Sequence, residues 1–156
     1  SDGLGRGSSF TVRLPLAEDR LQRPATPPPK KPGAGTKVVL IEDNHDSREM
    51  LQMILRLDGF EVESAEDGQA GLETIMQQRP EIALIDIGLP KLNGYEVARR
   101  IREFQDTSEI RLVALTGYGQ DKDRLAVSQA GFDEHLVKPV NLDQLRRVLA
   151  TPRKPR

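Results

Sequence analysis

Five polar residues end or follow short apolar segments of the sequence: Glu42, Asp43, Asp86, Thr116 and Lys138. Three carboxylates that meet at one place repel one another, and a divalent cation relieves that repulsion. Oxygen ligands suit Mg²⁺, or Mn²⁺, and Mg²⁺ commonly binds one or two carboxylates together with phosphate oxygens. These residue types therefore predict a divalent metal site if the fold brings them together.

The same residues suit the handling of a phosphoryl group. A lysine ammonium pairs with phosphoryl oxygens, and a threonine hydroxyl can donate a hydrogen bond to one of them. An aspartate carboxylate can accept phosphate covalently, and Asp86 is the best placed because it ends the central predicted strand. Phosphoryl transfer depends on positioning and charge neutralisation, so no histidine or serine base is required. We therefore predict Asp86 as a phosphoryl acceptor, with Lys138 and Thr116 beside it.

Five strand-like apolar segments alternate with five amphipathic segments of helical period. Long crossovers of this kind force parallel strands, and right-handed crossovers place helices on both faces of the sheet. In such doubly wound α/β sheets, ligands bind at the carboxyl ends of the strands, where the polar residues lie. The strands are predicted at 37–41, 61–65, 81–87, 110–116 and 134–138, and the helices at 47–59, 68–78, 93–104, 121–131 and 141–150.

Composition and charge narrow the function classes. The 156 residues include no cysteine, which excludes disulfides and thiolate metal sites and is consistent with the cytoplasm. No apolar run approaches the roughly 20 residues that cross a bilayer. Residues 36–150 carry a net charge of −7, whereas residues 1–35 and 151–156 each carry +3. An acidic body argues against nucleic-acid binding, which needs a positive face.

Four motifs resemble the response-regulator receiver domain in order and spacing: "LIEDN" (40–44), "LIDIGLPKLNGYEVARRIR" (84–102), "ALTGYG" (114–119) and "HLVKP" (135–139). The resemblance implies a flavodoxin-like (βα)5 fold with strand order 2-1-3-4-5. It also implies phosphorylation of Asp86 by a phosphohistidine of a histidine kinase or a phosphotransfer domain. Phosphorylation would then switch a surface that binds a downstream protein partner.

The resemblance further implies a ligand set for Mg²⁺. Asp43 and Asp86 would bind the ion directly together with the backbone carbonyl of Gly88, and Glu42 would act through a water molecule. The peptide bond before Pro139 would be cis, a form that only X-Pro bonds adopt at low cost.

The phosphoryl oxygens would, by the same resemblance, contact four groups. These are the side chains of Thr116 and Lys138 and the backbone N–H groups of Ile87 and Gly117. On phosphorylation the Thr116 hydroxyl moves inward, and an aromatic residue three positions before the lysine follows it. This sequence has His135 there, so the imidazole would have to take over that movement.

The sequence before the receiver-like region has a different character. Residues 3–16, "GLGRGSSFTVRLPL", resemble the last glycine-rich turn and final strand of a histidine kinase ATP-binding domain. Six of the eleven prolines lie between 15 and 32, which favours an extended linker. We therefore expect a kinase remnant at 1–16, a linker at 17–35, a receiver domain at 36–150 and a basic tail at 151–156. The parent would be a hybrid sensor histidine kinase, of which this piece is a phosphoacceptor without ATP-binding or kinase residues.

Two other functions use a similar set of residues. A pseudo-receiver would bind partners without being phosphorylated. A phosphohydrolase of the haloacid-dehalogenase type also forms an aspartyl phosphate, but it needs a second acid where this sequence has Gly88. His45 and His135 lack partner ligands in the sequence, so surface or packing roles are expected for both.

Overall fold

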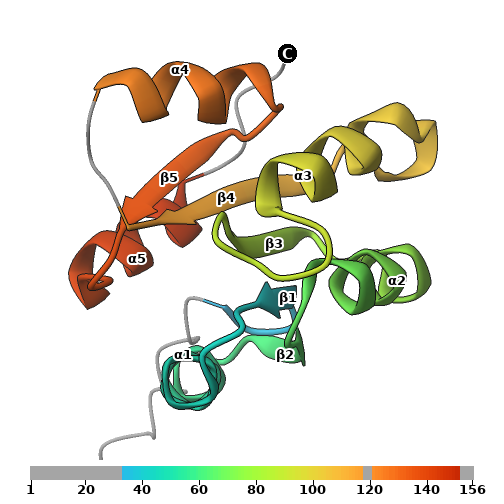
Figure 1. Ribbon diagram of the computed structural model, residues 1–156. Coiled ribbons are helices and arrows are strands. Elements are labelled where there is room, and N and C mark those ends of the chain that lie inside the picture. The colour runs from blue at the N-terminus through green and yellow to red at the C-terminus, as the bar shows by residue number, and fades with distance from the viewer. Residues whose placement is uncertain (1–32, 118–120, 152–156) are drawn as a thin grey trace, which may run out of the picture. The chain divides into compact units, whose positions relative to one another are not determined.

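The computed structural model describes residues 33–117 and 121–151, with only the backbone for 121–124. Five strands and five α-helices alternate along this part of the chain (Figure 1). The strands are β1 (Lys37–Ile41), β2 (Glu61–Ala65), β3 (Ile82–Asp86), β4 (Arg111–Thr116) and β5 (Glu134–Val137). The helices are α1 (His45–Leu57), α2 (Gly68–Gln78), α3 (Gly94–Glu103), α4 (Asp121–Gln129) and α5 (Leu142–Ala150), with a 3-10 turn, η1 (Gln105–Thr107), between α3 and β4.

The strands form one parallel sheet in the order β2-β1-β3-β4-β5, which confirms the predicted fold and topology. Every residue of β3 and β4 is buried, because helices cover both faces of these inner strands. Strand β2 lies at an edge, and buried and exposed residues are mixed along it.

Two hydrophobic layers hold the helices against the sheet. Helices α1 and α5 cover one face and α2 and α3 the other (Figure 1). The first layer contains Leu51 and Leu55 of α1 and Leu145 and Leu149 of α5. The second contains Ile75 of α2, Val97 and Ile101 of α3 and Val127 of α4. Both layers are anchored on strand residues that are at most a few per cent exposed, so the strand ends are held rigidly.

Helix boundaries follow the capping residues. The predicted start of the first helix at residue 47 is two residues late, because the Asn44 side chain accepts a hydrogen bond from the Ser47 N–H at 2.9 Å and the helix begins at His45. Asn141 caps α5 in the same way, as predicted. Helix α1 therefore begins two residues after Asp43, directly beside the acidic pair.

The predicted kinase remnant at 1–16, most of the predicted linker and nearly all of the basic tail lie outside the described residues. The last linker residues are described, and the Gly33 N–H donates to the Asp58 carbonyl at 3.1 Å. Among the helices described, we find no segment that is both long and apolar enough to span a membrane.

Candidate functional site

Three acidic side chains meet at the carboxyl ends of β1 and β3. Each of Glu42, Asp43 and Asp86 offers a carboxylate oxygen, and the three oxygens lie within 4.8 Å of one another. Asp86 is the last residue of β3, and Glu42 and Asp43 directly follow β1. Because β1 and β3 pair as parallel neighbours, residues 44 positions apart in the sequence reach the same edge. The predicted acidic cluster is therefore present.

Lys138 joins this cluster from the end of β5. Its Nζ lies 2.7 Å from Asp86 Oδ2 and 2.9 Å from Glu42 Oε1, and the Glu42 side chain is only 1 % exposed. Burial by itself lowers the pKa of Lys138, but the hydrogen bonds and negative charges of Asp86 and Glu42 outweigh burial and raise the pKa above its ordinary value. The ammonium is therefore charged throughout the neutral range.

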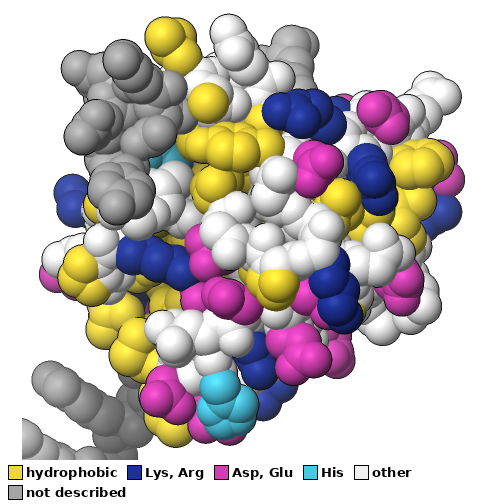
Figure 2. Space-filling view, viewed as in Figure 1, with side chains coloured by type: hydrophobic (Ala, Val, Ile, Leu, Met, Phe, Trp, Pro, Cys, Tyr) yellow, Lys and Arg dark blue, Asp and Glu magenta, His cyan; other side chains and the backbone are white. Residues whose placement is uncertain are grey.

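The cluster fits a divalent cation. At neutral pH the three carboxylates and one ammonium carry a formal charge of −2 together. Glu42 Oε2 is buried and lies 2.7 Å from Lys138 Nζ, yet within the described part of the chain it has no partner in hydrogen-bond geometry. Lys138 pairs with this oxygen by charge, and the net negative charge of the cluster remains for a cation to balance. Figure 2 shows further Asp and Glu side chains gathered on the face over α1 and the loops beside it.

A cleft of ≈ 330 Å³ opens beside Asp86. Of the three clustered carboxylates, Asp86 alone is among the described residues that line it. Thr116 is the last residue of β4, is 4 % exposed and forms part of the cleft wall. Its carbonyl accepts a hydrogen bond from the Lys138 backbone N–H at 2.7 Å. One lining residue, Tyr95, is not among the predicted site residues. The full lining is Asp86, Ile87, Gly88, Tyr95, Thr116, Gly117 and Lys138.

One predicted donor, the Ile87 amide, has a partner within the sheet, and its contact with a phosphoryl oxygen stays a prediction. The Ile87 N–H donates to the Leu115 carbonyl at 3.1 Å, because pairing with β4 continues one residue beyond the end of β3. Its single hydrogen is therefore used within the sheet. The next amide, that of Gly88, donates to Asp86 Oδ1 at 3.1 Å and so points to the carboxylate. The Gly88 N–H is therefore a backbone donor to the Asp86 side chain.

The other predicted positions have mixed outcomes. The Lys138–Pro139 peptide is cis, as expected. Gly117 lines the cleft directly after Thr116. His135 lies on β5 opposite Ala114 and is half-buried, and it is not among the described residues that line the cleft. Its role as a moving switch residue stays a prediction.

An ion pair between Asp67 and Lys91, here called the clamp, fixes the loop that carries Gly88. Asp67 caps α2 by accepting the Ala70 N–H at 2.8 Å, and its other oxygen lies 2.6 Å from Lys91 Nζ in the β3–α3 loop. A Cβ on Gly68 would lie 1.8 Å from the Leu92 carbonyl oxygen, so only glycine permits this approach. The clamp holds the β3–α3 loop against the start of α2.

The clamp predicts a pH dependence of stability. The hydrogen bond from Lys91, followed by that from the Ala70 amide, lowers the pKa of Asp67 below its ordinary value. The ionised carboxylate therefore stabilises the fold above about pH 4, and this contribution is lost as the pH falls through the lowered pKa. Asn caps helices as well as Asp, so Asp67→Asn removes mainly the charge.

We expect Asp67→Asn to lower the urea midpoint at neutral pH, and the gap from the wild type to close as the solution is made acidic. Urea unfolding of both chains across a pH series measures this gap. A gap of the same size at every pH would show that the ion pair with Lys91 is not its origin.

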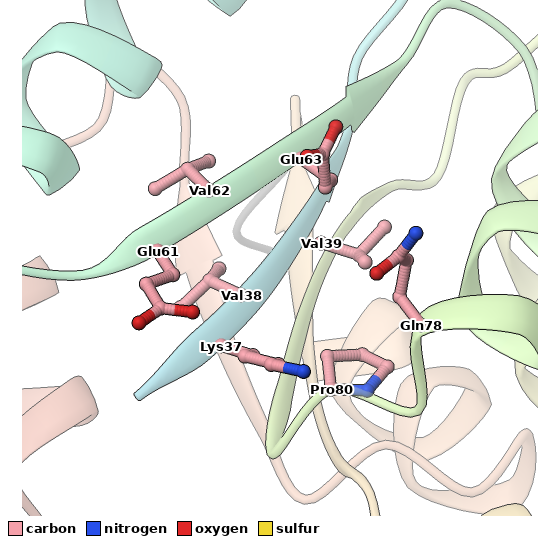
Figure 3. A pocket seen from close by; sticks show the side chains of 8 residues that line it. All are labelled: Lys37, Val38, Val39, Glu61, Val62, Glu63, Gln78 and Pro80. Carbon is pink, nitrogen blue, oxygen red and sulfur yellow. The ribbon is translucent and has the colours of Figure 1, made fainter. Parts of the chain in front are cut away.

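A second, smaller cavity of ≈ 80 Å³ lies between β1, β2 and the end of α2 (Figure 3). It includes Lys37 and Glu61, which are paired at the first positions of β1 and β2. These residues lie at the strand ends opposite the acidic cluster. The remaining lining is Val38, Val39, Val62, Glu63, Gln78 and Pro80. This cavity is separate from the candidate site.

Known proteins share both the sequence pattern and the fold. A family model of the response regulator receiver domain matches residues 38–150. The transcriptional regulatory protein CseB of Streptomyces coelicolor is 38% identical over 104 residues, which cover 67% of this chain and 43% of CseB. The chain spans less than half the length of the named regulators that it matches.

Two solved structures are similar over nearly three quarters of the chain. The receiver domain of sensor histidine kinase PA1611 from Pseudomonas aeruginosa, with a magnesium ion coordinated in its active site cleft, is 33% identical with a TM-score of 0.69, covering 74% of this chain and 95% of that one. The receiver domain of Ssk1 from Saccharomyces cerevisiae, solved with the phosphotransfer protein Ypd1, is 27% identical with a TM-score of 0.70, covering 73% of this chain and 86% of that one.

Proposed function

This chain belongs to the response regulator receiver domain family of two-component signalling, and from that premise we propose that Asp86 accepts a phosphoryl group from a protein phosphohistidine in a reaction that needs Mg²⁺. The proposal is carried by one observation. Of the clustered carboxylates, Asp86 alone lines the described cleft, and two donors, Lys138 Nζ and the Gly88 N–H, point to its two oxygens.

The residues around Asp86 orient the transfer. A carboxylate oxygen of Asp86 forms a new O–P bond as the N–P bond of the phosphohistidine breaks, and the imidazole nitrogen keeps the bonding electrons and takes up a proton. Lys138, the Thr116 hydroxyl and the N–H groups of Gly88 and Gly117 would face the phosphoryl oxygens across the cleft. Rigid strand ends supply the positioning on which such transfers depend.

The acidic cluster supports a magnesium site, which we assign to Asp43, Asp86 and the Gly88 carbonyl, with Glu42 acting through water. Mg²⁺ bound there would neutralise charge on the phosphoryl oxygens. The assignment is supported by the charge of −2 on the cluster, by the three carboxylate oxygens within 4.8 Å of one another and by the metal in the similar PA1611 receiver. Mn²⁺ prefers the same oxygen ligands and would serve in place of Mg²⁺.

Labelling with a small phosphodonor tests the proposal. In excess Mg²⁺, acetyl phosphate should add a single phosphoryl group to each chain, seen as a mass increase of the intact protein. EDTA should reduce the labelling to background, because the remaining negative charge of the cluster would repel the donor. No mass increase in excess Mg²⁺ would instead indicate a pseudo-receiver, and steady release of phosphate from phosphate esters would indicate a phosphohydrolase.

The donor and the parent protein follow from the same proposal. We propose a histidine kinase or a phosphotransfer protein as donor, supported by the similarity to the Ssk1 receiver solved with Ypd1. Similarity to the receiver of a sensor histidine kinase, together with the kinase-like pattern at residues 3–16, supports a hybrid histidine kinase as the parent. We propose a protein as the downstream partner because the acidic receiver region disfavours nucleic acid.

A further inference from the structure

The guanidinium of Arg48 lies against the backbone of Glu42 and Asp43. Arg48, in the first turns of α1, has a side chain that is 14% exposed. Its Nη1 donates to the Glu42 carbonyl at 2.7 Å and to the Asp43 carbonyl at 3.2 Å. One nitrogen therefore joins the peptide carbonyls of two candidate metal-site residues that follow each other in the chain.

These contacts fix the backbone from which the carboxylates project. The Glu42 N–H donates to the Ala65 carbonyl at 3.1 Å, so Glu42 is held at both its amide and its carbonyl. Asp43 is held at its carbonyl by Arg48 and is followed by the Asn44 cap of α1. A fixed backbone fixes the Cα–Cβ direction and leaves only side-chain rotamers free.

We propose that Arg48 is a positioning residue that sets the Mg²⁺ affinity of the site through Glu42 and Asp43, an inference that rests on the proposed function. It touches the carbonyls of these residues and would not itself contact the metal. Loss of groups that orient metal ligands typically weakens metal binding by about 10- to 100-fold.

The charge of Arg48 and its contacts with the backbone have opposite expected effects on Mg²⁺ affinity, which makes the proposal testable. A guanidinium near a divalent cation repels it, so charge alone would make removal of Arg48 tighten Mg²⁺ binding. Positioning predicts that removal weakens binding. Arg48→Gln removes the charge, whereas Arg48→Lys keeps the charge on a shorter side chain that lacks the planar guanidinium.

The experiment is a titration of ¹⁵N-labelled protein with MgCl₂, following the amide shifts of Asp86 and Gly88. We expect the Mg²⁺ dissociation constant to rise about tenfold or more in both Arg48→Gln and Arg48→Lys. In acetyl phosphate labelling, the Mg²⁺ concentration at half-maximal rate should rise more than the maximal rate falls. A merely structural role would not produce this split.

Arg56→Gln is the matched control. Arg56 lies on the same helix and donates to the Val62 carbonyl at 2.9 Å, away from the acidic cluster, so its loss should leave the dissociation constant within about twofold. Binding by Arg48→Gln as tight as wild type or tighter would overturn the proposal, as would unchanged binding by Arg48→Lys. If Arg48→Gln does not fold, Arg48→Lys decides alone. Failure of the wild type to bind Mg²⁺ would overturn the proposed function itself.

Discussion

A chain carrying Asp86→Asn should take up no phosphoryl group from acetyl phosphate, with labelling reduced at least ~10³-fold at any Mg²⁺ concentration. The carboxamide has nearly the shape of the carboxylate and can still accept the Gly88 N–H through its oxygen. It is, however, a poor nucleophile and carries no charge to pair with Lys138. The loss would therefore reflect chemistry at residue 86, and intact-protein mass measures it directly.

Asp43→Asn is the matched control for this experiment. Asp43 belongs to the acidic cluster but does not line the described cleft, so its loss should weaken metal binding and leave the acceptor in place. Labelling of Asp43→Asn should recover at least in part as Mg²⁺ is raised, whereas that of Asp86→Asn should not. Equal labelling of Asp86→Asn and wild type would reject Asp86 as the acceptor.

The residues that meet at the site could be predicted because of one property of parallel sheets. Strands β1, β3 and β4 are buried, apolar and separated by helices, so their carboxyl ends must share one edge. Any polar residue that directly follows such a strand is brought to that edge. Asp43, Asp86 and Thr116 were identifiable for this reason, without knowledge of any side-chain contact.

Contacts that depend on backbone direction could not be predicted in this way. Pairing of the Ile87 N–H with Leu115 depends on how far the ladder continues past β3, which side-chain periodicity does not record. Arg48 lies on an amphipathic helix and is indistinguishable in sequence from a solvated arginine. The ion pair of Asp67 with Lys91 joins two loops, and Lys91 adopts φ 64°, an unusual value for a lysine. Each contact arises only after the loops have folded.

Arg102→Met should destabilise the fold by about 2 to 4 kcal/mol, somewhat less than the usual cost of removing one partner from a fully buried ion pair, because this pair is partly buried. The Arg102 side chain, at the end of α3, is 12% exposed, as is that of its partner Asp133. Its guanidinium donates to Asp133 Oδ2 at 2.8 Å and to the carbonyls of Gly131, Ser108 and Ile110 at 2.9, 2.6 and 2.7 Å. Its loss would remove the guanidinium from these partly buried acceptors.

Arg102 joins segments that lie far apart in the sequence. Ser108 and Ile110 precede β4, and Gly131 and Asp133 precede β5, so one side chain fastens the starts of both strands to α3. Asp133 Oδ2 also accepts the Leu112 N–H of β4 at 2.8 Å. Because β4 ends in Thr116 and β5 leads to Lys138, this junction helps to hold two walls of the cleft in register.

Urea unfolding of the variants measures the effect. Arg100→Met, on the same helix but with an exposed side chain, is the matched control and should change the free energy of unfolding by less than about 0.5 kcal/mol. Met preserves helix propensity and much of the aliphatic stem, so the difference between the two variants isolates the buried polar contacts of Arg102. A loss below about 1 kcal/mol for Arg102→Met would mean that water replaces the guanidinium at these carbonyls, and that the packing of β4 and β5 alone maintains their register.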